Sequence, residues 1–212
     1  GFAFTFLIVE FGGGSLFLLL LFSAVLCIIL GMGMPTVGVY VLLAVIVAPS
    51  LVEVGITPIA AHMFILYFGM MSLITPPVAV AAFFAASIAQ APAMATGWTS
   101  MRFGWTAYVV PFLFVFSPSL LLQGDDTVIL AVDVATAVFG VWLVSAAMIG
   151  YFINALNPAM RAFAFLTGIL LLIPQELVTG VGWTDILGAV LALIFVVSDY
   201  LLTRRRRAAI SG

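Results

Sequence analysis

Residues 15–52 read SLFLLLLFSAVLCIIL-GMGMPT-VGVYVLLAVIVAPSLV, and this stretch decides which kind of fold the chain can adopt. Two apolar arms, residues 15–30 and 37–52, flank a break that is rich in glycine and contains proline. Each arm of 16 residues would span roughly 24 Å as a helix, less than the hydrocarbon core of about 30 Å. The pattern therefore predicts a re-entrant helical hairpin. Two complete membrane spans are the alternative. The order of the loops cannot distinguish the two, because both arrangements return the chain to the same side of the membrane.

The next stretch repeats the pattern of apolar arms around a proline-containing interruption. Residues 59–74 and 78–89 are apolar, and Thr75-Pro76-Pro77 separates them. Proline lacks a backbone donor and disfavours helical geometry in the residue before it, so Thr75 and Pro76 should be unwound. We therefore predict one transmembrane helix that is broken inside the membrane.

The composition excludes a soluble domain. Hydrophobic residues make up 66% of the 212-residue chain and charged residues 7%, with a mean hydropathy of +1.38, whereas soluble domains carry about 25% charged residues. Six basic residues against eight acidic ones give a net charge of −2 and no basic surface for nucleic acid. One cysteine and one histidine exclude a disulfide framework and Cys- or His-rich metal sites. We expect an all-α polytopic integral membrane protein without a metal site.

Four further apolar segments lie near residues 103–122, 127–152, 159–173 and 184–202. Arg102, Arg161 and the run of arginines at 204–207 fall in alternate loops, so the positive-inside rule makes those loops and the C-terminus cytoplasmic. The expected organisation is an interfacial arm (1–14), the re-entrant hairpin (15–53), the broken transmembrane helix with a cytoplasmic loop (54–101), a transmembrane helix (102–123) and a C-terminal extension of three transmembrane helices with an Arg-rich tail (124–212). Because residue 1 is not Met, we interpret the chain as a piece of a longer protein.

The two breaks are the candidate functional site. Unpaired backbone at membrane depth survives only where it is buried or lines a cavity. Carbonyl oxygens at a half-helix end can hold a cation such as Na⁺, and amide groups at the other end attract an anion. The predicted Na⁺ ligands are Gly31, Gly33, Met34, Thr36, Ser72 and Thr75, and the predicted substrate-binding residues are Pro35, Thr36, Pro76, Pro77 and Ala79. The alternative is a non-transporting assembly subunit whose breaks serve packing only.

Four motifs carry a resemblance to a known family: GMGMPT at 31–36, AP at 48–49, AAHMF at 60–64 and ITPPVA at 74–79. In this order they resemble the large membrane subunit of TRAP (tripartite ATP-independent periplasmic) transporters. The resemblance covers about residues 1–120. Residues 125–212 are similar to the extra C-terminal helices of permeases in which the small and large subunits are fused.

The resemblance implies an elevator-type, sodium-driven importer of an organic acid in the bacterial inner membrane, and not an enzyme. Substrate would come from an extracytoplasmic binding protein, with Na⁺ as the coupling ion and no other cofactor. The hairpin and the broken helix would form one of two Na⁺ sites and one wall of the substrate site, as half of an inverted-repeat transporter. The partners implied are the N-terminal remainder of the permease, including its small-subunit helices, and the lipid bilayer.

The remaining chemistry-bearing residues have simpler interpretations. His62 could be a proton relay, but a packed or interfacial histidine is the better interpretation, and Ser15 with His62 lacks the positioned acid that a serine hydrolase requires. Asp133 and Asp199 lie in apparent spans near their ends and are interpreted as structural. Cys27 is interpreted as a small buried hydrophobe.

Overall fold

The computed structural model describes residues 15–123, 127–173 and 183–210, and these residues form helices, turns and loops without a β-strand. The chain divides into two compact units, Gly1–Leu121 and Leu122–Gly212. The predicted interfacial arm, residues 1–14, lies outside the described residues. The all-helical prediction is confirmed for the described part of the chain.

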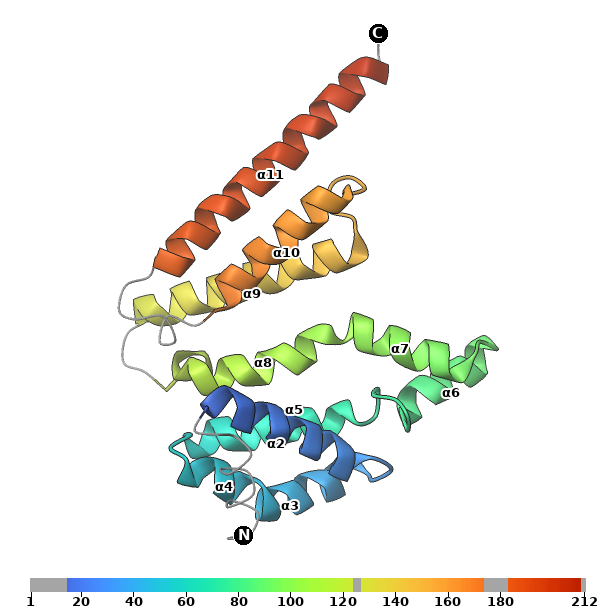
Figure 1. Ribbon diagram of the computed structural model, residues 1–212, viewed down its shortest axis with the longest axis vertical. Helices are drawn as coiled ribbons and strands as arrows, with labels where there is room; N and C mark the ends of the chain where they lie inside the picture. Colours follow the sequence, from blue (N-terminus) through green and yellow to red (C-terminus); the bar gives the residue numbers. More distant parts are fainter. Residues whose placement is uncertain (1–14, 124–126, 174–182, 211–212) are drawn as a thin grey trace. The chain divides into compact units, whose positions relative to one another are not determined.

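The first unit begins with the predicted helical hairpin. Helix α2 (Leu16–Gly31) and helix α3 (Thr36–Ile46) lie side by side and are joined by the glycine- and proline-containing turn (Figure 1). The second arm is not the continuous helix that the sequence indicated. It ends at Ile46, and a short helix α4 (Ala48–Glu53) follows, with Pro49 in its first turn, where a missing N–H is tolerated. The depth of this hairpin in a bilayer stays a prediction.

The second predicted break is also present. Helix α5 (Pro58–Met71) packs against both arms of the hairpin, and helix α6 (Val80–Ala89) resumes after residues 72–79. The interruption is longer than the Thr75-Pro76-Pro77 motif alone, and the Pro76–Pro77 peptide bond is cis. One backbone hydrogen bond spans the interruption: the Ala81 N–H donates to the Leu73 carbonyl oxygen at 2.9 Å.

Residues 93–101, which we interpreted as loop, are helical. Helix α7 (Ala93–Phe103) meets α6 at a bend of 119°. It is followed at Gly104 by helix α8 (Trp105–Phe116) and a short 3₁₀ turn, η1 (Pro118–Leu121). The apolar segment near 103–122 therefore holds a shorter helix than expected, since Ser117-Pro118 ends it. The missed signal for α7 is Pro92, which stands at its N-cap.

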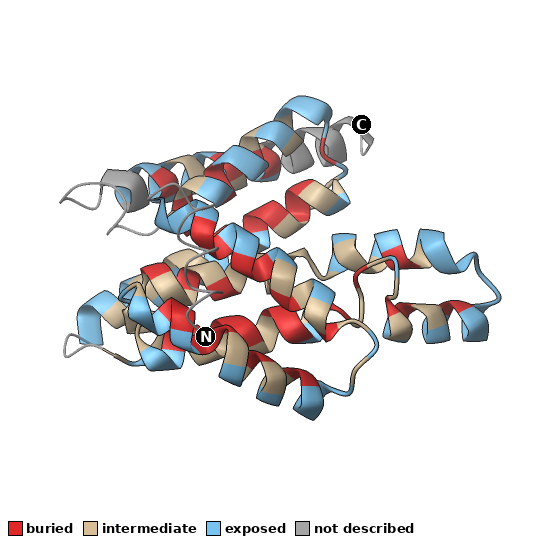
Figure 2. Cartoon of the chain, turned by 60° about the horizontal axis from the view of Figure 1, so that its bottom comes forward, coloured by how far each residue is buried: buried red, intermediate tan, exposed pale blue. Residues whose placement is uncertain are grey.

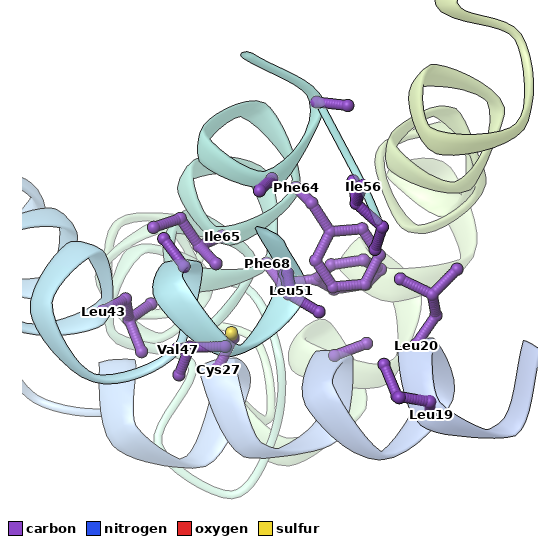
Figure 3. Close-up of a cluster of buried hydrophobic side chains, with 14 of the residues drawn as sticks. Leu19, Leu20, Cys27, Leu43, Val47, Leu51, Ile56, Phe64, Ile65 and Phe68 are labelled. Carbon is purple, nitrogen blue, oxygen red and sulfur yellow. The ribbon is translucent and has the colours of Figure 1, made fainter. Parts of the chain in front are cut away.

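Buried side chains of the first unit gather where α2, α3, α4 and α5 face one another (Figures 2 and 3). Phe64, Ile65 and Phe68 of α5 lie at the centre of this cluster, and Cys27 is fully buried there, as interpreted from the sequence. Phe112 of α8 adds edge-on ring contacts to Phe64 and Phe68 at 5.5 and 5.6 Å. Because lipid tails are as apolar as these side chains, close packing rather than transfer from water holds the helices together in a bilayer.

The second unit contains the three helices predicted for it. They are α9 (Thr127–Ile149), α10 (Pro158–Leu172) and α11 (Trp183–Ile210). Helices α9 and α10 approach closely at Gly140 and Gly168. A Cβ added to Gly168 would lie 2.8 Å from the Gly140 carbonyl oxygen. Small residues at such a crossing allow tight packing in lipid.

Two charged side chains fix the α9–α10 connection within the second unit. The Asp199 carboxylate is 2% exposed and accepts from the Ile153 N–H at 3.1 Å and from Asn154 Nδ2 at 3.3 Å. The Arg161 guanidinium donates to the carbonyl oxygens of Ala147 and Met148 at the C-terminus of α9, at 2.9 and 3.1 Å. These contacts support the structural interpretation of Asp199.

By length and composition, α9 can cross a membrane, and the bent pair of α6 and α7 passes the same test together. The other apolar helices in the described ranges are shorter, with 10–17 residues, and include α2, α3, α5, α8 and α10. The 16 residues of α2 match the length predicted for the first arm of the hairpin, and α3 is shorter than the second predicted arm. These lengths do not test how many times the chain crosses the bilayer.

Candidate ion and substrate site at two helix breaks

The structure brings the two predicted breaks together through one side chain. Ser72, the first residue after α5, is buried, and its hydroxyl donates to the Gly31 carbonyl oxygen at 3.0 Å. The same hydroxyl lies 2.7 Å from the Gly69 carbonyl oxygen one turn earlier in α5. A single hydroxyl proton therefore serves two carbonyl oxygens, one from each of the two broken elements.

Gly31 is required at this crossing because no side chain fits there. A Cβ at Gly31 would stand 2.7 Å from the Gly69 carbonyl oxygen and 2.9 Å from the Ser72 hydroxyl oxygen. Gly69 is equally tight, since a Cβ there would meet the Val39 and Leu43 side chains of α3 at 2.6 and 2.9 Å. The end of α2 and the end of α5 thus approach each other backbone to backbone.

Thr75 is the second hydroxyl of the site, and its hydrogen bonds have a fixed direction. It is buried, donates its one proton to the Met71 carbonyl oxygen, and lies 2.7 Å from the Tyr108 hydroxyl of α8. Because the Thr75 proton is already donated to Met71, Tyr108 must donate to the Thr75 oxygen. Tyr108, Thr75 and Met71 form a directed chain that leaves Thr75 one unused lone pair.

The backbone within the second break contacts α7. The Ser100 hydroxyl donates to the Ile74 carbonyl oxygen at 2.9 Å and lies 2.7 Å from the Gly97 carbonyl oxygen. Ala79 is fully buried and has a φ of 34°, which is uncommon for a residue with a Cβ. Both Ala79 and Pro76 pack beside Gly97, where a Cβ would lie 2.9 Å from Pro76 Cγ. The Ala79 side chain therefore faces α7.

The tip of the hairpin is the open part of the site. Gly33, Pro35 and Thr36 are exposed, and an added Cβ at Gly33 would find open space, although the φ of 78° there strains any other residue. Met34 is half-buried and packs on the core cluster. Of the predicted residues, Gly31 and Ser72 are in contact, Thr75 lies a few residues beyond Ser72, and Thr36 and Pro77 are exposed.

The chemistry available here is that of oxygen atoms and helix ends. Hydroxyl and carbonyl oxygens suit a hard cation, and the N-termini of α3 and α6 offer backbone N–H groups to an anion. In this structure the Gly31 carbonyl oxygen accepts from both Ser72 and the Met34 N–H, the latter at 3.4 Å. A cation that used the Gly31 oxygen would replace one of those donors.

Sequence reasoning did not find Tyr108, Ser100 or Gly69. Tyr108 and Ser100 lie on helices that carry none of the motifs, and only the polarity of Tyr108 within the apolar helix α8 could have marked one of them. His62 lies half-buried with its Nδ1 3.0 Å from the Tyr40 hydroxyl, away from both breaks in sequence. This contact agrees with the interpretation of His62 as a packed histidine.

Short apolar helices, interrupted at two places that contact each other, are an arrangement typical of membrane transport proteins. A sequence model of the family described as "Tripartite ATP-independent periplasmic transporter, DctM component" matches residues 1–125, more than half of the chain. The chain belongs to this family, which comprises large membrane subunits of TRAP transporters and is a transporter family rather than an enzyme family. The match covers both helix breaks and ends just beyond the first compact unit.

No curated protein and no solved structure matches the chain.

Proposed function

We propose that the chain is part of a sodium-coupled secondary transporter, of the fused permease type, that imports an organic acid by an elevator movement. Family membership supports the part of this proposal that makes the chain a component of a transporter. Members of the family work in the inner membrane with a binding protein and a small subunit. The substrate is delivered by an extracytoplasmic binding protein. The rest of the permease supplies the other half of the inverted repeat. The chain crosses the membrane several times, and the arginine pattern favours a cytoplasmic C-terminus.

One observation carries the sodium proposal: the Ser72 hydroxyl joins the Gly31 and Gly69 carbonyl oxygens where the two breaks meet. Oxygen atoms from two discontinuous helices converge at this point without a charged side chain. A Na⁺ ion bound beside them uses carbonyl oxygens around Gly31, Gly33 and Met34, together with the oxygens of Ser72 and Thr75. Thr36 contributes from the first turn of α3.

The substrate proposal rests on the helix ends next to these oxygens. With His62 neutral, Glu53 is the one charged side chain in residues 12–101, so no lysine or arginine there can pair with an acid. A carboxylate is bound instead by backbone N–H groups at the starts of α3 and α6, with the Thr36 hydroxyl. Pro35, Pro76 and Pro77 hold the turns open, and Ala79 contributes its backbone because its side chain is buried.

Thermal unfolding of the full-length protein in NaCl and in KCl tests sodium binding without knowledge of the substrate. A ligand that binds only the folded state stabilises it by RT ln(1 + [L]/Kd), about 2.7 kcal/mol at a hundredfold excess over Kd. We expect a higher Tm in NaCl, and a clearly smaller difference for Ser72→Ala and Thr75→Val.

The matched control is Ser87→Ala, because the Ser87 hydroxyl donates within α6 to the Phe83 carbonyl oxygen at 2.9 Å and lies on an exposed face. Ser87→Ala should keep the full response to sodium. Equal Tm values in the two salts for the unsubstituted protein would contradict the sodium site. That result would favour an assembly subunit whose breaks serve packing only.

A further inference from the structure

The second unit contains a pocket that the transport proposal does not use. It has a volume of about 320 Å³ and lies between the C-terminal end of α9, the turn after it and one residue of α11. Trp142, Ile149, Phe152, Ile153 and Val196 supply most of its apolar wall. Ser145 and Tyr151 are the polar side chains among its lining residues. The pocket is therefore suited to an apolar ligand.

The wall of this pocket is fixed in place. The Ile153 N–H is held by the buried Asp199 carboxylate at 3.1 Å, and Arg161 caps the end of α9 that carries Ile149. Phe152 packs on Trp142 at 4.9 Å and on Phe195 at 5.3 Å between ring centres. Both charged groups hold the backbone that forms the wall. The pocket is preformed, and preformed sites bind without the loss of entropy that ordering a loop requires.

The volume and the setting favour one segment of a lipid acyl chain. At about 30 Å³ per water molecule, 320 Å³ corresponds to roughly ten waters, which is too small for a whole lipid. Trp142 and Tyr151 are of the residue types that concentrate at membrane interfaces, and Arg161 marks this end of α9 as cytoplasmic by the positive-inside rule. Lipid in the inner leaflet is therefore the apolar material nearest to the pocket.

The positive charge in the last turns of α11 favours a lipid with an anionic headgroup. The helix continues from Val196 past Asp199 through residues 204–207, all of them arginine, to Ile210. At 1.5 Å per residue, the arginines begin roughly 12 Å beyond Val196 along the helix. A run of basic residues directly beyond the cytoplasmic end of a membrane helix attracts anionic lipid.

We propose that this pocket binds an acyl chain of a phospholipid from the surrounding inner leaflet, and that the positive charge of the sequence at 204–207 favours an anionic headgroup on that lipid. The lipid packs against the preformed wall of α9 and α11 and anchors the second unit. The site is independent of sodium coupling and of the transported substrate, because it lies wholly outside the two helix breaks.

Bromine on lipid chains quenches tryptophan fluorescence on contact, and Trp142 lines the pocket. The full-length protein, with every tryptophan except Trp142 replaced by Phe (in this chain Trp98, Trp105 and Trp183), is reconstituted into dioleoylphosphatidylcholine vesicles. Increasing fractions of chain-brominated phosphatidylglycerol or chain-brominated phosphatidylcholine are then added. Each arginine near an anionic surface contributes about a fivefold preference. Half-maximal quenching should therefore need a fraction of phosphatidylglycerol at least roughly fivefold lower than of phosphatidylcholine.

Two variants separate the pocket from bulk lipid. Replacing the arginines at 204–207 by Gln should remove the preference for phosphatidylglycerol, and Val196→Phe should reduce it by filling the pocket. A tryptophan at exposed position 128 of α9, in the Trp142→Phe background, should show no preference.

Equal half-quenching fractions for the two lipids at Trp142 would overturn the proposal. A preference that survives the Arg-to-Gln replacement would also overturn it. Trp142 that is shielded from both lipids would assign the pocket to another part of the permease instead.

Discussion

The Ser72 hydroxyl oxygen lies 3.0 Å from the Gly31 carbonyl oxygen, across 41 positions of sequence. This contact joins the end of α2 to the end of α5, so the two helix breaks of the first unit form one feature. In hydrocarbon, where water is absent, an unpaired carbonyl is costly. The Ser72 hydroxyl gives the Gly31 carbonyl oxygen a closer donor than the Met34 N–H, which lies 3.4 Å away. The contact fixes the end of α2 against the end of α5 and brings oxygen atoms from both helices together.

Gly31→Ala tests the close approach at this contact. The new Cβ would lie 2.7 Å from the Gly69 carbonyl oxygen, so the backbone of α2 or α5 must shift. We expect a loss of unfolding free energy of about 1–3 kcal/mol, measured by thermal unfolding in detergent. Gly38→Ala is the matched control, because its Cβ would meet only Pro35 Cδ at 4.0 Å in an exposed part of α3. Equal stability of the two variants would contradict the tight crossing.

Tyr108→Phe tests the directed hydrogen-bond chain to Thr75. Removing the donor leaves the Thr75 oxygen with its bond to Met71 alone, so the break should open more readily. The expected loss of stability is small, about 0.6 kcal/mol for an average side-chain hydrogen bond in a membrane helix bundle. Amide hydrogen exchange at residues 75–81 should nevertheless become faster.

Tyr67→Phe is the control for that substitution, since the structure assigns Tyr67 a ring contact with Phe114 at 5.7 Å that phenylalanine preserves. Its exchange at the same amides should match the unsubstituted protein. If Tyr108→Phe also leaves that exchange unchanged, Tyr108 does not stabilise the break.

Asp199→Ala tests the buried carboxylate of the second unit. The Ile153 N–H and the Asn154 side chain would lose an acceptor inside the protein, at a cost of about 1–3 kcal/mol. Faster amide exchange at Ile153 should accompany the lower Tm. Ser198→Ala is the neighbouring control, because the Ser198 hydroxyl donates within α11 to Ile194. A variant at Asp199 as stable as the control would show that the carboxylate is dispensable.

The sequence predicted the elements whose signal is local. Apolar length and proline position located α2, α5, the turn between α2 and α3, the second break and the three helices of the second unit. The stop at Ile46 was missed because Ala48-Pro49 was read as a motif within a continuous arm, although proline favours a new helix start there. Helix α7 was missed because its sequence is less apolar than that of the neighbouring helices and includes Thr96, Thr99 and Arg102, a composition that also suits a loop.

The site was only partly predictable, because some of its residues carry a local sequence signal and the others are brought in by tertiary packing. Composition of the breaks pointed to Gly31, Ser72 and Thr75, which have unusual residue types for an apolar stretch. The partners Tyr108 and Ser100 come from α8 and α7, and their proximity depends on the 119° bend between α6 and α7. Tertiary packing of that kind leaves no spacing pattern in one sequence.

The central claim, that the hairpin tip lies in an ion-coupled cavity, is tested most directly by cysteine labelling at Thr36. In the full-length protein with Cys27→Ala, Thr36→Cys is labelled by a membrane-impermeant maleimide from each side, in sodium and in potassium. Glu53→Cys, at the exposed base of the hairpin, serves as the control that should label freely in both salts.

We predict slow to intermediate labelling at position 36 with a rate that sodium changes. Free labelling from one side at the same rate in both salts would identify residues 31–36 as an ordinary loop between two full spans, and would contradict the ion site.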